Sequence, residues 1–228
     1  MSFDLALRLT EILLALAFIQ QSAEHLAGAK DERILFLLRL ALSGLLLIGF
    51  YTPIICALLA LHAVLMLHRF QGPYNGGSDR MGLLILFCVT LAHVLPTERW
   101  QELALGYLAL QLLLSYFISG YVKIINPEWR NGRALNDVFS FSAYPASEAL
   151  RGLANRPRIL YATSWAVIGF ELVFPLSFLT EGTLLAALFI AALFHLANAF
   201  LFGLNRFFWV WLAAYPSILW LQDRLISF

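Results

Sequence analysis

Charged residues are few in this chain. Asp, Glu, Lys and Arg make up 13% of its 228 residues and hydrophobic residues 61%, whereas roughly a quarter of the residues of a soluble domain are charged. The net charge of +1 predicts no partner, and no motif of a nucleic-acid-binding module is found. The composition excludes an ordinary soluble domain and indicates a membrane protein.

Cysteine and metal-binding motifs are also scarce. Cys56 and Cys88 are the two cysteines, and we expect both to be small buried apolar residues rather than parts of a disulfide framework. The five histidines show neither a His-x3-His spacing nor a repeated Glu-x-x-His pair. Interhelical hydrogen bonds are therefore the favoured role of the histidines, ahead of a bound metal or haem, and no metal site is predicted. No glycine-rich phosphate-binding loop is found.

Long apolar segments dominate what is present. A membrane span needs roughly 20 apolar residues, which predicts an all-α polytopic transmembrane helix bundle of seven or eight spans. The whole chain, 1–228, is expected to form a single transmembrane domain. The expected spans are 5–25, 34–50, 53–69, 81–96, 102–123, 159–180, 182–204 and 206–222.

Basic residues are distributed unevenly between the connections. With eight spans, the connections after the first, third, fifth and seventh carry eleven Lys and Arg residues, and the other side carries Arg99 and Arg224. The positive-inside rule then places the richer side in the cytoplasm and both termini outside. A bacterial inner membrane is the expected location.

Ionisable residues inside spans are functional candidates, because they are costly in hydrocarbon. Glu171 must find a cation or stay protonated, and Arg39 is a possible partner. His195 and Asn198 are three residues apart and share a helix face. Pro175 removes a backbone donor four residues after Glu171, which predicts a local kink. If the protein is an enzyme, its catalytic candidates are Glu171, His195 and Asn198.

The connection from 70 to 80 has turn residues together with charge. Arg69, Tyr74, Asp79 and Arg80 form or flank it, and such a loop can bind an anion or cover a cavity. The alternative is a solvated turn whose arginines contact lipid headgroups.

The longer connection, from 124 to 158, begins with signals for a short helix. Asn126 is a good N-cap and Pro127 suits the first helical position. Trp129 and Arg133 can then lie at the membrane interface, with Lys123 extending to the same level. We therefore expect a short interfacial helix after the fifth span and include Lys123, Trp129 and Arg133 among the ligand-binding candidates.

Several motifs together resemble a known family. "YFISGYVKIINPEWRNGRAL" (116–135) has an aromatic helix, a Gly, a Lys and then Trp-x-x-Gly; "FELVFPLSF" (170–178) and "FHLANAFLF" (194–202) follow in order, and "YNGGSDRMGLL" (74–84) is a weaker match. In order and spacing they resemble the HTTM family, the membrane domain shared with vitamin K-dependent gamma-glutamyl carboxylase.

The same resemblance argues against carboxylation. The stretch that matches the carboxylase's base lysine is "LHRFQGP", which has Arg69 and Gln71 but no lysine, and arginine is too strong a base to lose its proton there. Within residues 1–228 we also expect no counterpart of the carboxylase's extramembrane substrate domain.

Three functions remain open. The favoured one is a structural or accessory membrane protein that binds a lipid, a quinone or a partner protein. The first alternative is an intramembrane quinone- or thiol-redox-linked enzyme, and the second is a transporter. Lipid or quinone is the possible cofactor, although the sequence requires none. The expected partners are membrane lipids, with other membrane subunits or a small thiol-disulfide oxidoreductase as further candidates.

Overall fold

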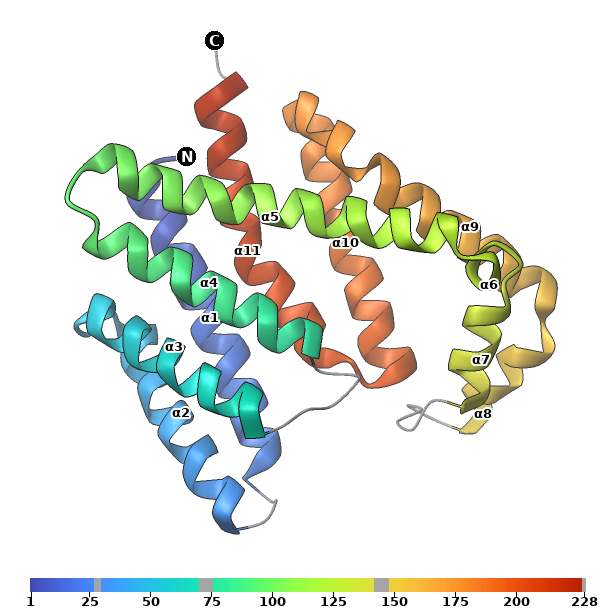
Figure 1. Ribbon diagram of the computed structural model, residues 1–228, viewed down its shortest axis with the longest axis horizontal. Helices are drawn as coiled ribbons and strands as arrows, with labels where there is room; N and C mark the ends of the chain where they lie inside the picture. Colours follow the sequence, from blue (N-terminus) through green and yellow to red (C-terminus); the bar gives the residue numbers. More distant parts are fainter. Residues whose placement is uncertain (27–29, 70–75, 142–147, 227–228) are drawn as a thin grey trace. The chain divides into compact units, whose positions relative to one another are not determined.

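The computed structural model is all-helical in the part of the chain that it describes, residues 1–26, 30–69, 76–141 and 148–226 (Figure 1). The helices are α1 (Phe3–His25), α2 (Lys30–Ile48), α3 (Thr52–Arg69), α4 (Gly76–Val94), α5 (Glu98–Ile125), α6 (Pro127–Arg130), α7 (Arg133–Phe141), α8 (Glu148–Arg151), the 3₁₀ helix η1 (Gly152–Asn155), α9 (Pro157–Val173), the 3₁₀ helix η2 (Phe174–Leu179), α10 (Glu181–Phe202) and α11 (Asn205–Ile226).

The chain divides into two compact units. Unit 1 comprises residues 1–110 and 206–228, and unit 2 comprises residues 111–205. α5 begins in unit 1 and ends in unit 2, so it contributes residues to both. The chain leaves unit 1 inside a continuous helix and returns to it at the start of α11.

Unit 1 is built around two helical hairpins. α1 packs against α2 and α4, and α3 packs against α2 and α4. Buried polar contacts join these helices: the Glu11 carboxylate lies 2.8 Å from Arg8 Nη1 and 2.5 Å from His93 Nε2. Glu11 of α1 therefore faces the unit's interior, as the cost of exposing a charge to hydrocarbon requires.

Unit 2 contains the end of α5, the short helices α6 to α8 and the pair α9 and α10. A small core of Leu135, Phe139 and Leu160 joins α7 to α9. α9 ends at Val173, and the chain continues as η2, with Pro175 in its first turn. The kink predicted near Pro175 takes the form of this change from α to 3₁₀ geometry. Proline cannot supply the backbone N–H that an α-helix needs.

Four helical segments are long and apolar enough to cross a membrane: 77–94, Glu98–Ile125, Pro157–Leu179 and Glu181–Phe202. A fifth, Thr52–His68, is apolar but shorter. α1, α2 and α11 coincide with the other expected spans, and the charged residues Arg8 and Arg39 lie within the first two of these. The membrane class is therefore supported by the structure, whereas the count of seven or eight spans stays a prediction.

The short helix expected after the fifth span is present as α6, followed by α7. Asn126 is its N-cap, with the side chain accepting a hydrogen bond from the Glu128 N–H at 2.9 Å, and Pro127 occupies the first turn. Gly132 then adopts φ +79°, which is readily accessible to glycine. The predicted N-cap Asn126 and first-turn Pro127 are confirmed.

Candidate functional site

One face of α5 in unit 2 gathers four residues of the motif between 116 and 123. Tyr116, Ser119, Gly120 and Lys123 are spaced i, i+3, i+4 and i+7, which puts them on one side of an α-helix. Tyr116 and Lys123 are separated by about 10 Å along the axis. The face therefore offers two separate polar positions, each of which contacts a different helix.

The first position is an ion pair between α5 and α9. Lys123 Nζ lies 2.8 Å from Glu171 Oε1 and 2.7 Å from Oε2, and it also donates to Ser119 Oγ at 2.6 Å. The side chains are 14% and 4% exposed, so the pair is largely shielded from solvent. Ser119 Oγ also lies 3.2 Å from Glu171 Oε1.

This pair corrects one expectation about the charges. The cation beside Glu171 is Lys123, and Arg39 belongs to unit 1, where its guanidinium lies over the Phe18 ring. Lys123 donates to both carboxylate oxygens of Glu171, and its ligand-binding role stays a prediction. Arg39 was suggested only by its presence in an apolar segment, which says nothing about which helices pack together.

Gly120 makes the pair possible. A Cβ at this position would lie 2.8 Å from the backbone N of Leu172 and 2.9 Å from Glu171 Cβ. Contacts this short are essentially never observed for real Cβ atoms, so only glycine lets α5 approach α9 so closely, as small residues do at other membrane helix interfaces. The glycine and the lysine of the motif thus serve the same contact.

The Trp-x-x-Gly part of the motif also packs on α9. Lys123 Nζ lies 5.0 Å from the centroid of the Trp129 ring, within the range of a cation–π interaction. The Trp129 carbonyl accepts a hydrogen bond from Ser164 Oγ at 2.5 Å. A Cβ on Gly132 would be 3.0 Å from Tyr161 Cα. Trp129 therefore covers the ion pair, and Gly132 brings the chain against α9.

The second polar position joins α5 to α10. The Tyr116 hydroxyl and His195 Nε2 lie 2.8 Å apart, and both residues are buried. The Tyr116 ring stacks on Phe174 with centroids 4.0 Å apart. Asn198, one turn along α10, is half-buried, and no side-chain hydrogen bond to it is found among the described residues. The expected His195 and Asn198 patch is therefore joined to Tyr116 through its histidine.

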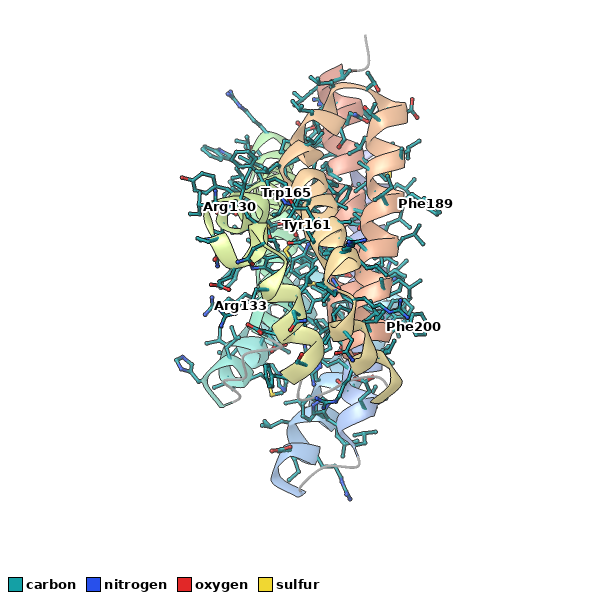
Figure 2. All side chains as sticks on the ribbon, turned by 90° about the vertical axis from the view of Figure 1, so that its right-hand side faces the viewer. Arg130, Arg133, Tyr161, Trp165, Phe189 and Phe200 are labelled. Carbon is teal, nitrogen blue, oxygen red and sulfur yellow. The ribbon has the colours of Figure 1, made fainter. Side chains whose placement is uncertain are left out.

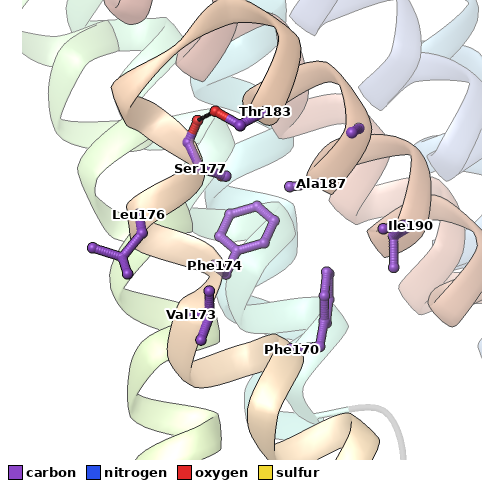
Figure 3. Close-up of a pocket in the computed structure, with 9 residues that line it drawn as sticks. Phe170, Val173, Phe174, Leu176, Ser177, Thr183, Ala187 and Ile190 are labelled. Carbon is purple, nitrogen blue, oxygen red and sulfur yellow. Dashed lines mark hydrogen bonds between the residues drawn. The ribbon is translucent and has the colours of Figure 1, made fainter.

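A groove lies next to this aromatic cluster, between α9, η2 and α10 (Figure 3). Its volume is about 320 Å³. The lining residues are Phe170, Val173, Phe174, Leu176, Ser177, Thr183, Ala186, Ala187 and Ile190. Seven of these nine side chains are hydrocarbon, and the two hydroxyl groups are supplied by Ser177 and Thr183. No sequence pattern indicated this groove.

The remaining expected binding residue of unit 2, Arg133, begins α7, which follows α6 and its last residue Arg130. Figure 2 shows Arg130 near Trp165, whose indole N–H donates to the Arg130 carbonyl at 3.1 Å. Arg133 is exposed and lies 3.3 Å from Glu128 and 3.8 Å from Asp137. Phe189 and Phe200 project outward from α10 (Figure 2), and they are 65% and 69% exposed. An outward apolar surface of this kind suits contact with lipid.

The expected binding residues of the connection at 70–80 are only partly described. Asp79 is in the first turn of α4 and accepts a hydrogen bond from Gln21 at 3.3 Å. Arg80 is exposed. Arg69 ends α3, but its side chain, like the whole of Tyr74, lies outside the described residues. The ligand-binding role of these four residues stays a prediction.

A family model named HTTM domain matches residues 90–222, more than half of the chain. The chain belongs to the HTTM family. No curated protein matches it, and no solved structure does. Together with the four apolar segments long enough for a bilayer, the family identifies a membrane protein.

In this HTTM protein, residues of the motif between 116 and 135 form the contact between helices α5 and α9. Gly120 sets the distance between α5 and α9, Lys123 binds Glu171, and Trp129 covers the pair. Lys123, Trp129 and Glu171 were predicted from the sequence as candidates, whereas Tyr116, Ser119 and the groove were not. The i, i+3, i+4, i+7 spacing along α5 is the signal from which the first two could have been found.

Proposed function

We propose that this HTTM protein is an accessory membrane component that holds the apolar chain of a lipid or an isoprenoid quinone in the groove of unit 2. We further propose that it has no glutamyl carboxylase activity. The observation that supports binding is the groove between α9, η2 and α10, with its hydrocarbon lining. Both Pro157–Leu179 and Glu181–Phe202 are long and apolar enough to cross a bilayer, so the groove belongs at the depth of lipid chains.

One polar group in the groove gives the proposed ligand an orientation. Ser177 lines it, and within the described part of the chain the buried Ser177 Oγ has no hydrogen-bond partner. A hydroxyl that is buried without a partner is unfavourable unless a ligand supplies one. An ester carbonyl of a lipid or a ring carbonyl of a quinone can accept this hydrogen bond. The apolar chain then lies along Phe170, Val173 and Ile190.

The polar contacts of unit 2 favour an accessory role over carboxylation. Glu171 and Lys123 bind each other, so neither is free to exchange protons with a substrate without first breaking a buried ion pair. The stretch that resembles the carboxylase's base position has Arg69 and Gln71 in place of lysine. A guanidinium stays protonated at any physiological pH.

The groove is tested by filling it. Ala186 is exposed and lines the groove, so we expect Ala186→Trp to displace the apolar chain at little cost to folding. The measurement is mass spectrometry of organic extracts from protein purified in mild detergent. We expect co-purified lipid or quinone to fall by about tenfold, corresponding to about 1.4 kcal/mol of lost binding free energy.

Ala197→Trp is the matched control, because Ala197 is also exposed on α10 but does not line the groove. The control should retain the ligand at the level of the unmodified protein. The masses in the extract distinguish the two sources, since phospholipids and isoprenoid quinones differ in mass and in ultraviolet absorption. Equal ligand content in both variants would contradict the proposal.

The alternative function, an intramembrane enzyme acting on a quinone-like substrate, is favoured by one observation. The buried Tyr116 and His195 pair lies next to the groove, because Tyr116 stacks on the lining residue Phe174. Tyr116→Phe keeps the stacked ring and removes the hydroxyl. If the accessory role is correct, we expect this variant to lose about 1 kcal/mol of stability and to keep its bound ligand. A redox change of bound quinone that disappears in Tyr116→Phe would support the enzyme instead.

The location and partners belong to the same proposal. We place the protein in a bacterial inner membrane, where an accessory component could bind other membrane subunits or a small thiol-disulfide oxidoreductase. Outward aromatic residues such as Phe189 and Phe200 are compatible with lipid or with another helix. Crosslinking from Ala197 and from Phe189 would distinguish lipid contact from protein contact.

A further inference from the structure

The groove of unit 2 is polar at one end. Figure 3 shows Ser177 and Thr183 together at that end, with Phe170 and Ile190 farther along. Thr183 Oγ1 donates to the Ser177 carbonyl at 2.8 Å and lies 2.7 Å from Thr180 Oγ1, so the threonine hydroxyls bind within the protein. Ser177 Oγ is buried and has no hydrogen-bond partner in the described part of the chain. A ligand in the groove can therefore receive one hydrogen bond at this end.

A carboxylate stands beside the same end. Glu181 is the first residue of α10 and lies in the sequence between Thr180 and Thr183, whose side chains form the polar cluster. Glu181 is exposed, and among the residues that the structure describes no ion pair or hydrogen bond to its side chain is found. The sequence has no lysine or arginine from 159 to 205, so η2 and α10 supply no basic partner. The carboxylate is thus available to a cationic group of a ligand.

The basic residues of unit 2 do not neutralise this carboxylate. All six of them precede position 159, and Arg158 is followed by Phe170 twelve residues later on the same helix, about 18 Å along the axis. Lys123 is the exception, because it binds Glu171, the neighbour of Phe170 in the sequence. That ion pair has no net charge. Counting Lys123, Glu171 and Glu181, unit 2 gives this end of the groove one net negative charge.

The size and the lining of the groove suit one hydrocarbon chain. Its volume of about 320 Å³ is at the lower end of the range for small-molecule pockets, which leaves no room for two long chains. Val173, Leu176 and Ile190 line the groove and are also exposed on the surface of unit 2. The groove is therefore open along its side. A lipid can place one chain in it while its second chain stays in the bilayer.

We propose that the occupant of this groove is a phospholipid with an ammonium headgroup, of the phosphatidylethanolamine class. This inference rests on the proposed function and adds the identity of the headgroup. Glu181 pairs with the ammonium group, Ser177 Oγ donates to an ester carbonyl, and one acyl chain lies along Phe170 and Ile190. The phosphate lies near the first turn of α10, since a helix N-terminus carries partial positive charge. A lipid with a net negative headgroup offers Glu181 no cation and is repelled by it.

The test is a competition between two lipids for the full chain in neutral detergent. Phosphatidylethanolamine and phosphatidylglycerol with identical acyl chains are added in equal amounts, and native mass spectrometry measures the ratio of the two one-to-one complexes. We expect about a fivefold excess of bound phosphatidylethanolamine, the upper end of what one exposed ion pair contributes. Glu181→Gln should bring the ratio close to one, and Glu181→Lys should invert it.

Three further variants test the rest of the site. Ser177→Ala removes the hydrogen-bond donor, so both lipids should bind about fivefold more weakly while their ratio is unchanged. Glu128→Gln removes a carboxylate of α6, in the basic part of unit 2, and Thr163→Ala removes an exposed hydroxyl of α9 outside the groove. Both controls should bind the two lipids as the unmodified protein does. Undiminished binding by Ser177→Ala would contradict the contact with the ester carbonyl.

The inference is overturned if the unmodified protein binds phosphatidylglycerol as well as phosphatidylethanolamine, if Glu181→Lys leaves the ratio unchanged, or if the native ligand is a quinone. Should Glu181→Lys fail to fold, Glu181→Gln decides, and an unchanged ratio overturns the inference. Ala186→Trp distinguishes this failure from that of the proposed function. If it displaces both lipids while their ratio in the unmodified protein is one, only the headgroup assignment fails; if it displaces neither, the proposed function fails.

Discussion

Replacing Glu171 with leucine is expected to lower the free energy of unfolding by about 3 to 5 kcal/mol, because it leaves the largely buried ammonium group of Lys123 without a counter-charge. Lys123→Met should lower the free energy of unfolding by a similar amount, because it leaves the Glu171 carboxylate without a counter-charge. The double variant should recover most of the loss, since neither charge then remains. Chemical or thermal unfolding of the purified protein in detergent provides the four free energies of this cycle.

The control for the ion pair is the exposed pair of Arg133 and Glu128. Their side chains are 67% and 47% exposed, so Glu128→Gln should change stability by less than about 1 kcal/mol. The interpretation of Glu171 and Lys123 as a coupled pair fails if the losses of the two single variants simply add in the double variant.

A second large effect is expected at Gly120. In Gly120→Ala the new Cβ would lie 2.8 Å from the backbone N of Leu172, so α5 and α9 must separate. We expect a loss of about 1 to 3 kcal/mol from overpacking, and a greater loss for Gly120→Val. Separation would also lengthen the contact of Lys123 with Glu171, so the two effects should not be additive when Gly120→Ala is combined with Glu171→Leu.

Gly106 is the matched control because it lies on the same helix. A Cβ at Gly106 would have Leu221 Cδ1 as its nearest neighbour at 3.6 Å, which is ordinary van der Waals contact. Gly106→Ala should therefore be neutral or stabilise α5 by up to about 1 kcal/mol through helix propensity. If Gly120→Ala and Gly106→Ala were equally stable, the interpretation that α5 and α9 pack too closely at position 120 for any residue but glycine would be wrong.

The features that were predicted correctly from the sequence are those set by local chemistry. Asn126 and Pro127 begin α6 as expected, because a capping side chain and a fixed φ act within one turn. Gly203 adopts φ +70° and ends α10, a backbone conformation that glycine adopts readily. The long helices follow the apolar segments because backbone groups in hydrocarbon must be hydrogen-bonded within the helix.

The features that could not be predicted depend on which helices meet. The charge of Glu171 demands a cation, yet nothing within its own segment distinguishes Lys123 from Arg39. Lys123 is the partner because Gly120 has no side chain, which lets α9 pack against the face of α5 that bears Lys123. The groove could not be predicted for the same reason, since its lining residues come from three consecutive elements whose spacing is a tertiary property.

The discontinuous sequence of unit 1 has a consequence for biosynthesis. His25 contacts Arg206, and the ring of Phe3 lies 5.6 Å from that of Trp220. The first helix, α1, therefore makes part of its contacts with the last helix, α11. At typical rates of synthesis, roughly ten to forty seconds separate the appearance of these partners. A nascent chain that stops at Asn205 therefore already has all of unit 2, while its first four helices still lack α11.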